Sequence, residues 1–242
     1  MLAAYAQDPG AYHQAQDDFG GPQGLLRSAA AAIEQSGPDD PGKSPGAAGD
    51  DETQALSRFA SSTGLWLDPT GIRDFMATHA MRSGSEHKVA HFLSQNRVVK
   101  DLDVQAVATE SLFDYLTDHL LSNYLFQDSI HLEGFYLYDG RLHIVVSQPF
   151  VEGVHPPWAA LKEGLEARGL HHESPNSLIP SFTVGDSLNC HLCINDLHEN
   201  NVILDTNGEL HPIDAHFYFN TRAERVEALT NLGLWPTASP SE

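Results

Sequence analysis

Three side chains with oxygen atoms that can bind a metal ion occur within a short segment near the C-terminus: Asp196, Asn201 and Asp214. The two carboxylates can also accept a proton. Carboxylate and amide oxygens are ligands that Mg²⁺ prefers. In phosphoryl transfer from a nucleotide, one carboxylate orients the acceptor hydroxyl, while an amide and a second carboxylate hold the metal against the phosphates. We therefore predict that Asp196 is catalytic and that Asn201 and Asp214 bind Mg²⁺. The alternative is an ordinary loop, where Asp and Asn are common as turn and cap residues.

A β-hairpin is predicted to bring these side chains together. Residues 202–204 have the β-branched composition of a short strand, and residues 209–213 are expected to pair with it. The intervening Asp-Thr-Asn-Gly suits a tight turn, because glycine adopts positive φ at little cost. With Leu204 opposite Glu209, Asp214 would emerge beside the amide ligand at the same end of the hairpin.

Composition narrows the classes of function. The 242 residues are enough for one domain of two lobes. The balance of 13 basic against 33 acidic residues gives a net charge of −20, which opposes binding to nucleic acid or to anionic membranes. No apolar run approaches the length of a membrane span, and the N-terminal segment lacks an export signal. Two cysteines form no disulfide framework. We expect a cytoplasmic protein with neither a nucleic-acid nor a membrane partner.

The cysteines raise a separate question, because Cys190 and Cys193 form a C-x-x-C motif with His191 inside it. A structural zinc site needs four ligands at recognisable spacing, and no second cysteine pair exists. A thioredoxin-like site needs a strand-to-helix context, whereas this segment leads into a polar loop. The favoured interpretation is a short strand with two half-buried small residues, and zinc or redox chemistry is the alternative.

The first part of the chain differs in composition from the rest. Residues 1–50 are rich in Ala, Gly, Gln, Asp and Pro, and we interpret them as a flexible, low-complexity leader with one candidate helix at residues 25–35. Their deletion is expected to leave the melting temperature nearly unchanged. The folded part should begin with a helix capped near Asp51, followed by a helix from Pro69 to about Thr78.

The remaining pattern predicts a small sheet with helices, then a second group of short strands. The expected elements are, in order, a strand ending at Phe92 and its return at 97–100, a helix at 110–126, a hairpin of 131–138 and 141–147, a linker at 148–153, a helix at 158–168 and a short strand at 182–185. Asp139–Gly140 is a strong hairpin signal.

This order of elements resembles the protein-kinase fold. More specifically, it resembles the serine/threonine/tyrosine kinase-like domain found in polyvalent proteins of phages and conjugative elements, over roughly Leu56 to Phe219. The segments that carry the resemblance are Ser83–His87, Arg97–Lys100, Leu132–Tyr136, Ser147–Gly153, and Asp196–Val202 with Pro212–Asp214. The resemblance implies an α+β, compact two-lobed fold with an N-lobe at 51–147, a hinge at 148–153 and a minimal, truncated C-lobe at 154–242.

The resemblance also implies ATP and Mg²⁺ as cofactors and assigns roles to further residues. Lys100 would neutralise the α- and β-phosphates. The turn Ser83–Gly84–Ser85 would cap the phosphates through its backbone N–H groups. His198 stands where protein kinases often have lysine and would steady the γ-phosphate.

Two further groups complete the nucleotide site that the resemblance implies. Gln148 and Phe150 lie in the hinge, whose backbone groups would meet an adenine edge. A carboxylate should position the lysine. Glu110 is the candidate nearest the start of the helix, and Asp114 and Glu86 are the alternatives.

Departures from the kinase pattern keep several functions open. Ile194–Asn195 replaces the usual His-Arg, Asp214-Ala-His replaces Asp-Phe-Gly, and only 28 residues follow Asp214. We favour a protein Ser, Thr or Tyr hydroxyl as the acceptor, with a small molecule as the alternative. The second hypothesis is a non-catalytic nucleotide-binding or scaffolding pseudokinase, because the phosphate loop has a single glycine.

Overall fold

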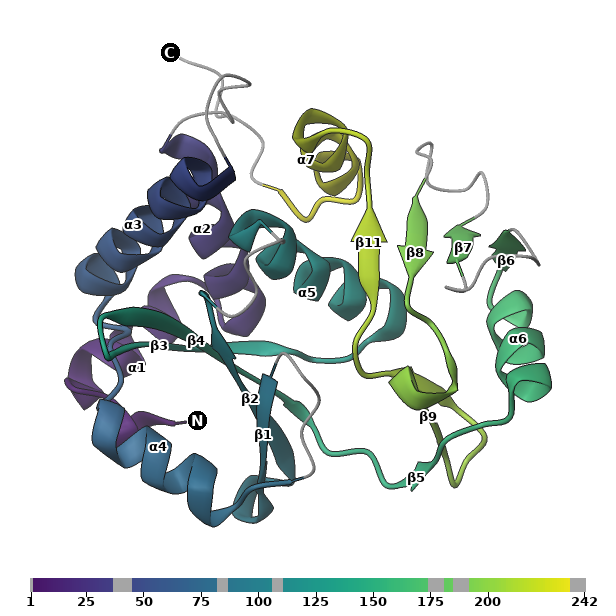
Figure 1. Ribbon diagram of the computed structural model, residues 1–242, viewed down its shortest axis with the longest axis horizontal. Helices are drawn as coiled ribbons and strands as arrows, with labels where there is room; N and C mark the ends of the chain where they lie inside the picture. Colours follow the sequence, from purple (N-terminus) through teal and green to yellow (C-terminus); the bar gives the residue numbers. More distant parts are fainter. Residues whose placement is uncertain are drawn as a thin grey trace. The chain divides into compact units, whose positions relative to one another are not determined.

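The protein is described by a computed structural model, which defines residues 2–36, 45–81, 87–105, 111–173, 181–184 and 192–235. The chain forms two compact units: unit 1 is Met1–Leu120 with Ser129–Phe150, and unit 2 is Leu121–Asp128 with Val151–Glu242. Each unit combines helices with antiparallel strands (Figure 1), so the predicted α+β class is confirmed. The final passage from unit 1 to unit 2 lies between Phe150 and Val151, within the segment predicted as a hinge. A truncated second lobe stays a prediction.

Unit 1 is built on a four-stranded antiparallel sheet in the order β1-β2-β4-β3. Its strands are β1 (His87–Phe92), β2 (Arg97–Asp103), β3 (His131–Tyr138) and β4 (Arg141–Pro149). Asp139 and Gly140 join β3 to β4 with φ values of 53° and 74°, as a tight hairpin turn between twisted strands requires. The strands and this turn confirm the sheet that the sequence pattern predicts for this part of the chain.

The α-helices of the described part of this unit are α1 (Pro9–Asp18), α2 (Pro22–Gln35), α3 (Pro45–Thr63), α4 (Pro69–Thr78) and α5 (Leu112–Phe126), whose last residues belong to unit 2. Helix α4 has the predicted bounds. Its first turn is set by Asp68, whose carboxylate accepts hydrogen bonds from the N–H groups of Thr70 and Gly71, with Pro69 at the first helical position.

The two faces of the sheet are covered by different helices. Tyr115 of α5 stacks on His87 of β1 with ring centroids 5.8 Å apart. Phe75 of α4 packs edge-on against Phe92 at the other end of β1, at 5.3 Å. Because successive strand residues point to opposite faces, residues 87 and 92 lie on opposite sides of the sheet. Helix α5 therefore covers one face and α4 the other.

The interpretation of residues 1–50 as a flexible leader is wrong for the described parts, residues 2–36 and 45–50, which form helices. Helix α1 begins after Asp8, whose carboxylate accepts hydrogen bonds from the N–H groups of Gly10 and Ala11. Helix α2, which includes the candidate helix, packs against α3 and β3 and buries Leu25, Leu26, Ala29, Ala30 and Ile33 completely. Apolar residues are few here, but they share one helical face and therefore form part of a core.

A buried carboxylate fixes this N-terminal segment to the sheet. Glu133 is 1% exposed and lies at a bulge in β3. Its Oε2 accepts hydrogen bonds from the backbone N–H of Leu2 at 3.1 Å and from the hydroxyl of Tyr12 at 2.8 Å. Its Oε1 accepts from the Ser147 hydroxyl at 2.5 Å, and that hydroxyl accepts from Arg97 Nε at 3.0 Å. A buried carboxylate requires such donors, and here they come from both the N-terminal segment and the sheet.

The described part of unit 2 contains two small antiparallel sheets, two α-helices besides the end of α5, and a 3₁₀ helix at Glu199–Asn201. One sheet has the order β10-β9-β5 and the other β11-β8-β7-β6. The elements are β5 (Gly153–Val154), α6 (Trp158–Ala167), β6 (Leu170–Glu173), β7 (Ser181–Val184), β8 (Cys193–Asn195), β9 (Val202–Asp205), β10 (Leu210–Pro212), β11 (His216–Tyr218) and α7 (Arg222–Asn231). Within the described ranges, no helix has both the length and the apolar character that a membrane crossing requires.

The tie between Glu133 and the N-terminal segment can be tested with Tyr12→Phe, which removes one hydroxyl donor from a buried carboxylate. We expect the free energy of unfolding to fall by about 1–3 kcal/mol, measured by urea denaturation. The matched control is Tyr124→Phe. Tyr124 is 45% exposed, and removal of its hydroxyl should change the free energy of unfolding by no more than about 0.5 kcal/mol. Equal stability of the two variants would contradict the proposed tie.

Candidate functional site

The β9–β10 hairpin forms as predicted, but its register is shifted by one residue. Leu204 faces Leu210 and not Glu209. Asp205 extends the strand, because its N–H donates to the Glu209 carbonyl at 2.9 Å. The connection is therefore a three-residue loop that ends at Gly208, with φ of 85°. Loops of this length commonly place glycine in that left-handed position.

This register brings the two predicted metal ligands to the same end of the hairpin. The N–H of Ile213 donates to the carbonyl of Asn201 at 2.8 Å, so Asp214 directly follows the residue opposite Asn201. A second pairing brings in Asp196. Strand β8 ends with Asn195, which faces His216 of β11. Asp196 therefore leaves β8 at the end where Asp214 leads into β11, and the three predicted residues gather at one end of unit 2.

Within this loop, the side-chain amide of Asn201 is bound to Asp196. Asn201 Nδ2 donates to the carboxylate oxygen Oδ2 of Asp196 at 2.6 Å and to its backbone carbonyl at 3.1 Å. Asp196 has φ of 64°, a conformation that an aspartate adopts more readily than most residues. Because both acceptors are oxygens, the amide must present its nitrogen to Asp196. Its oxygen is thereby left outside these two contacts, as a metal ligand requires.

His198 contacts the same carboxylate from the other side. Its Nε2 lies 3.3 Å from Asp196 Oδ1, and its Nδ1 accepts a hydrogen bond from the backbone N–H of Asn200 at 3.1 Å. The side chains of His198 and Asp196 are 31% and 36% exposed. The carboxylate is thus held by its own loop while part of it stays accessible to a substrate.

The donor set fits Mg²⁺. An amide oxygen and a carboxylate are hard oxygen ligands, and Mg²⁺ is usually held by one or two protein carboxylates together with substrate phosphates and water. No group of three or more His, Cys, Asp or Glu residues able to hold a metal occurs among the residues that the structure describes. A site of Asn201 and Asp214 does not depend on such a group, because phosphates supply the other ligands.

Of the cysteine motif, the structure describes Cys193. Cys193 lies on β8, and its thiol donates to Asn195 Oδ1 at 3.6 Å. Burial raises the pKa of this thiol, followed by the charge of Glu173, so the reactive thiolate is disfavoured. Cys190 and His191 lie outside the described residues.

Lys100 lies in the middle of the unit 1 sheet. It occupies β2, faces Val89 of β1 and Val146 of β4, and is 8% exposed. Leu102, which follows two residues later on the same face, is opposite His87, the residue on which α5 packs. Lys100 and α5 are therefore on the same side of the sheet, as a lysine positioned by a helix carboxylate requires.

Of the three carboxylates predicted to position Lys100, the structure describes Asp114. Glu110 and Glu86 lie outside the described residues, whereas Asp114 is in the first turn of α5. Sequence analysis overlooked Asp118, which follows Asp114 by four residues and is 7% exposed. The i, i+4 spacing places both carboxylates on one side of α5. This spacing is the sequence signal that indicates Asp118 as a further candidate.

The sequence also gave no indication of the group that fixes the start of α5. The Glu52 carboxylate accepts hydrogen bonds from the N–H of Leu112 at 2.6 Å and from the Ser111 hydroxyl at 2.8 Å. Glu52 is on α3 and is 5% exposed. It caps the helix from a distant part of the chain, and a local capping pattern cannot reveal such a contact.

The predicted phosphate loop, Ser83 to Ser85, lies outside the described residues, but the segments before and after it pair with each other. Ala80 is opposite Ala90, and the N–H of Met81 donates to the Val89 carbonyl at 2.7 Å. The predicted turn therefore lies between two antiparallel segments.

The predicted hinge begins inside the sheet. Gln148 belongs to β4, faces Val98 and is 7% exposed. The N–H of Phe150 donates to the Asn96 carbonyl at 2.9 Å, and its ring stacks on His91 with centroids 4.1 Å apart. Since this N–H is already bonded, Phe150 could meet an adenine edge through its carbonyl but not as a donor.

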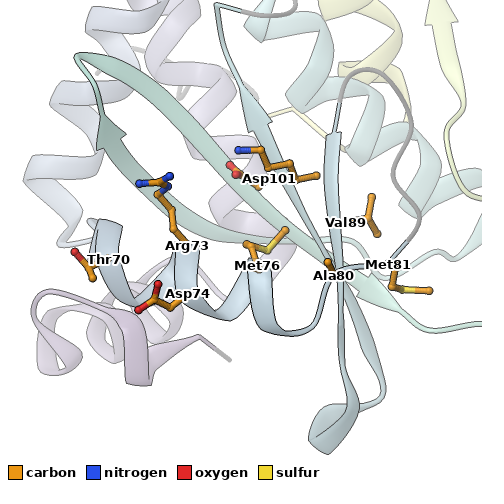
Figure 2. A pocket seen from close by; sticks show the side chains of 10 residues that line it. Thr70, Arg73, Asp74, Met76, Ala80, Met81, Val89 and Asp101 are labelled. Atoms are coloured by element: carbon orange, nitrogen blue, oxygen red, sulfur yellow. The ribbon is translucent and has the colours of Figure 1, made fainter.

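A cavity of about 410 Å³ in unit 1 lies elsewhere. Figure 2 shows Arg73 and Asp74 of α4 and Asp101 of β2 among the residues that line it. Asp101 is adjacent to Lys100 in β2 and therefore points to the opposite face of the sheet. None of the predicted site residues lines this cavity, and we assign it no part in nucleotide chemistry.

Comparison with known proteins supports the kinase resemblance. A family model described as the serine/threonine/tyrosine kinase found in polyvalent proteins matches residues 49–221. This match includes Lys100 of unit 1 as well as Asp196, Asn201 and Asp214 of unit 2. Neither the curated proteins nor the solved structures contain a significant match to the chain.

The turn that sets the hairpin register should depend on Asp205. Its Oδ1 accepts hydrogen bonds from the N–H groups of Glu209 at 2.8 Å and Asn207 at 2.9 Å. We expect Asp205→Ala to speed amide hydrogen exchange at residues 207 and 209, and Asp205→Asn, which keeps the acceptor oxygen, to have a smaller effect. Equal exchange in the parent and the alanine variant would show that the turn does not need this carboxylate.

The same contacts have a consequence for pH dependence. The backbone N–H of Glu209, followed by that of Asn207, lowers the pKa of Asp205. The unfolded chain therefore takes up this proton first, at a pKa of about 3.9. The stabilising contribution of the carboxylate is fully present above that value and is lost as pH falls through the lower folded-state pKa. A carboxyl NMR titration should show Asp205 protonating below the ordinary aspartate range.

Proposed function

Because the chain belongs to the family of serine/threonine/tyrosine kinases found in polyvalent proteins, we propose that it transfers the γ-phosphoryl group of ATP to a hydroxyl in the presence of Mg²⁺. The observation that carries this proposal is the Asn201 amide, which donates to Asp196 and leaves its oxygen for a metal. That arrangement separates the residue that orients the acceptor from the residues that hold the ion.

Asn201 and Asp214 are the proposed metal ligands. Mg²⁺ bound there would offset the negative charge of the phosphates. The chain would contribute two oxygen ligands. The β9–β10 pairing fixes the backbone position of Asn201, and Asp214 follows the residue that pairs with it. Asp214 supplies the negative charge and Asn201 a neutral oxygen.

Asp196 is the proposed acceptor-orienting residue. Its carboxylate would accept a hydrogen bond from the acceptor hydroxyl and align the oxygen with the phosphorus. A bond then forms between the acceptor oxygen and the γ-phosphorus, while the bond from that phosphorus to the β–γ bridging oxygen breaks. ADP leaves with the electron pair, and the hydroxyl proton passes to Asp196 and then to solvent. The 36% exposure of Asp196 allows this access.

Unit 1 supplies the proposed phosphate and base contacts. Lys100 would neutralise the α- and β-phosphates, with Glu110, Asp114 or Asp118 on the α5 side as the positioning carboxylate. The loop Ser83–Ser85 would contribute backbone N–H groups. These assignments follow from the family membership and from the place of Lys100 on the face that α5 covers.

A protein Ser, Thr or Tyr is the favoured acceptor, in keeping with the family description, and a small-molecule hydroxyl is the alternative. A non-catalytic nucleotide-binding role is the second functional class. Retention of Asp196, Asn201 and Asp214 in one place favours the enzyme. A cytoplasmic location, where ATP is abundant, belongs to the same proposal.

The enzyme and the non-catalytic module can be separated by ADP release and phosphoprotein mass spectrometry after incubation with Mg·ATP. Asp214→Asn should abolish Mg²⁺-dependent stabilisation by ATP in thermal unfolding and lower turnover, because it removes a charge from the ion's ligands. Asp196→Asn should keep the ATP-induced stabilisation but lower turnover by about 10²- to 10⁴-fold.

The matched control is Asp139→Asn, which makes the same charge change in the β3–β4 turn, where asparagine tolerates the φ of 53°. It should leave both measurements as in the parent. ATP-dependent stabilisation without turnover in the parent would identify a pseudokinase. Parental turnover in both Asp196→Asn and Asp214→Asn would show that phosphoryl transfer does not use this loop.

A further inference from the structure

The cavity of unit 1 is built from parts of the chain that the proposed phosphotransferase site does not use. Helix α4, the residues that follow it and strands β1 and β2 supply its lining, and its volume is about 410 Å³. Cavities of this size bind small organic molecules. Because Asp101 lines the cavity and Lys100 points to the other face of β2, a molecule in the cavity would not contact that lysine.

Arg73 is oriented in this cavity without the use of its N–H groups. Its guanidinium carbon lies over the Tyr138 ring, 3.4 Å from the ring centre. Figure 2 shows the side chain extending from α4 toward the strands. A guanidinium that stacks on an aromatic ring keeps its five N–H donors in its own plane, where they can bind another group. The contact with Tyr138 therefore holds the cation in place and leaves its donors available.

Lys88 adds a second cation to the same lining. It is opposite Asp101 in the β1–β2 pairing, and its side chain is exposed. Within the described ranges, neither Lys88 nor Arg73 forms an ion pair or a side-chain hydrogen bond. Acidic residues outnumber basic residues by 33 to 13, and Arg141, for example, pairs with Asp103 at 2.6 Å. The two cations of the cavity thus lack a counter-ion from the part of the chain that the structure describes.

The two carboxylates that line the cavity are not placed to act as that counter-ion. Asp101 is 3% exposed, and its Oδ1 accepts a hydrogen bond from His143 Nδ1 at 2.9 Å. Its Oδ2 accepts from the Tyr136 hydroxyl at 2.7 Å, so donors on β3 and β4 already offset its charge. Asp74 is exposed and follows Arg73 on α4, which turns its side chain by about 100° around the helix.

The rest of the lining is mainly apolar. Met76, which is 5% exposed, contributes to it together with Ala80 and Met81. Methionine side chains adapt to apolar groups of different shapes. The cavity therefore combines an apolar wall with two cations, and a carboxylate matches the paired donors of a guanidinium such as that of Arg73.

We propose that this cavity binds a small organic anion, with its carboxylate on Arg73 and Lys88 and its apolar body against Met76 and Met81. The site lies on the face of β2 opposite Lys100 and is separate from the proposed phosphotransferase site. The proposal goes beyond that function and does not depend on it.

The charge requirement can be tested with 1-naphthaleneacetate and its neutral counterpart of the same shape, 1-naphthaleneacetamide. Titration followed by ¹H–¹⁵N correlation spectra should show that the acid binds at least about 10-fold more tightly than the amide, because the amide cannot pair with a cation. The shifted signals should belong to α4 and β1. Equal affinity of the two probes would overturn the proposal, and so would the absence of binding by the acid up to about 1 mM.

Arg73→Met tests the location of the site, because it removes the guanidinium and keeps an unbranched stem. We expect it to weaken binding of 1-naphthaleneacetate by about 10-fold. The matched control is Arg58→Met, which makes the same charge change at an exposed position on α3 and should keep the parental affinity. Equal weakening in both variants would assign the effect to the charge of the protein as a whole and overturn the proposal.

Lys88→Met provides a second variant at an exposed position, where the substitution should not disturb folding. It should also weaken binding of the acid while leaving binding of the amide as in the parent. Parental affinity for the acid in both Arg73→Met and Lys88→Met would show that the anion binds elsewhere. All these measurements report binding without turnover, so they decide the proposal whether or not the protein releases ADP.

Discussion

The hydrogen bonds from the Asn201 amide to Asp196 are the interaction on which the candidate site depends. An amide has a donor end and an acceptor end, and the carboxylate of Asp196 attracts the donor end at 2.6 Å. The oxygen is therefore directed to other partners. One contact thus aligns the residue proposed to orient the acceptor and presents a ligand for the metal. His198 Nε2 lies 3.3 Å from the other carboxylate oxygen.

Backbone pairing determines where this loop lies relative to Asp214. Asn201 immediately precedes β9, and its carbonyl accepts the N–H of Ile213. Asp196 immediately follows β8, which pairs with β11. Strand pairing is stiff compared with side-chain rotation, and residues placed by it keep their relative positions without many contacts between their side chains. This explains how a half-exposed site can be organised by short strands of three or four residues.

Unit 1 shows how a buried charge can hold distant segments together. Glu133 receives donors from Leu2, Tyr12 and Ser147, which belong to the N-terminal segment and to β4. Loss of any donor leaves a carboxylate oxygen without adequate solvation in the interior, so the segments are energetically linked. The sheet that carries Lys100 is consequently stabilised by the N-terminal segment, although α1 and α2 precede residues 49–221, the part of the chain that the family model matches.

The sequence by itself determined the local elements whose cause is local. The strand pair joined by Asp139–Gly140, the bounds of α4 after Asp68–Pro69, and the hairpin that follows Asn201 all come from turn and cap residues acting on their neighbours. It also gave the family resemblance, since chemistry at Asp196, Asn201 and Asp214 needs those residue types in that order. Only the tertiary structure decided the hairpin register, because whether Asp205 joins the strand depends on its partner Glu209. The burial of the N-terminal helices in a core, the capping of α5 by Glu52 and the bonded N–H of Phe150 were likewise decided there. The packing of the N-terminal helices, the cap of α5 and the bond of Phe150 require contacts between residues far apart in the chain, and no local pattern records which distant donor or acceptor will be present.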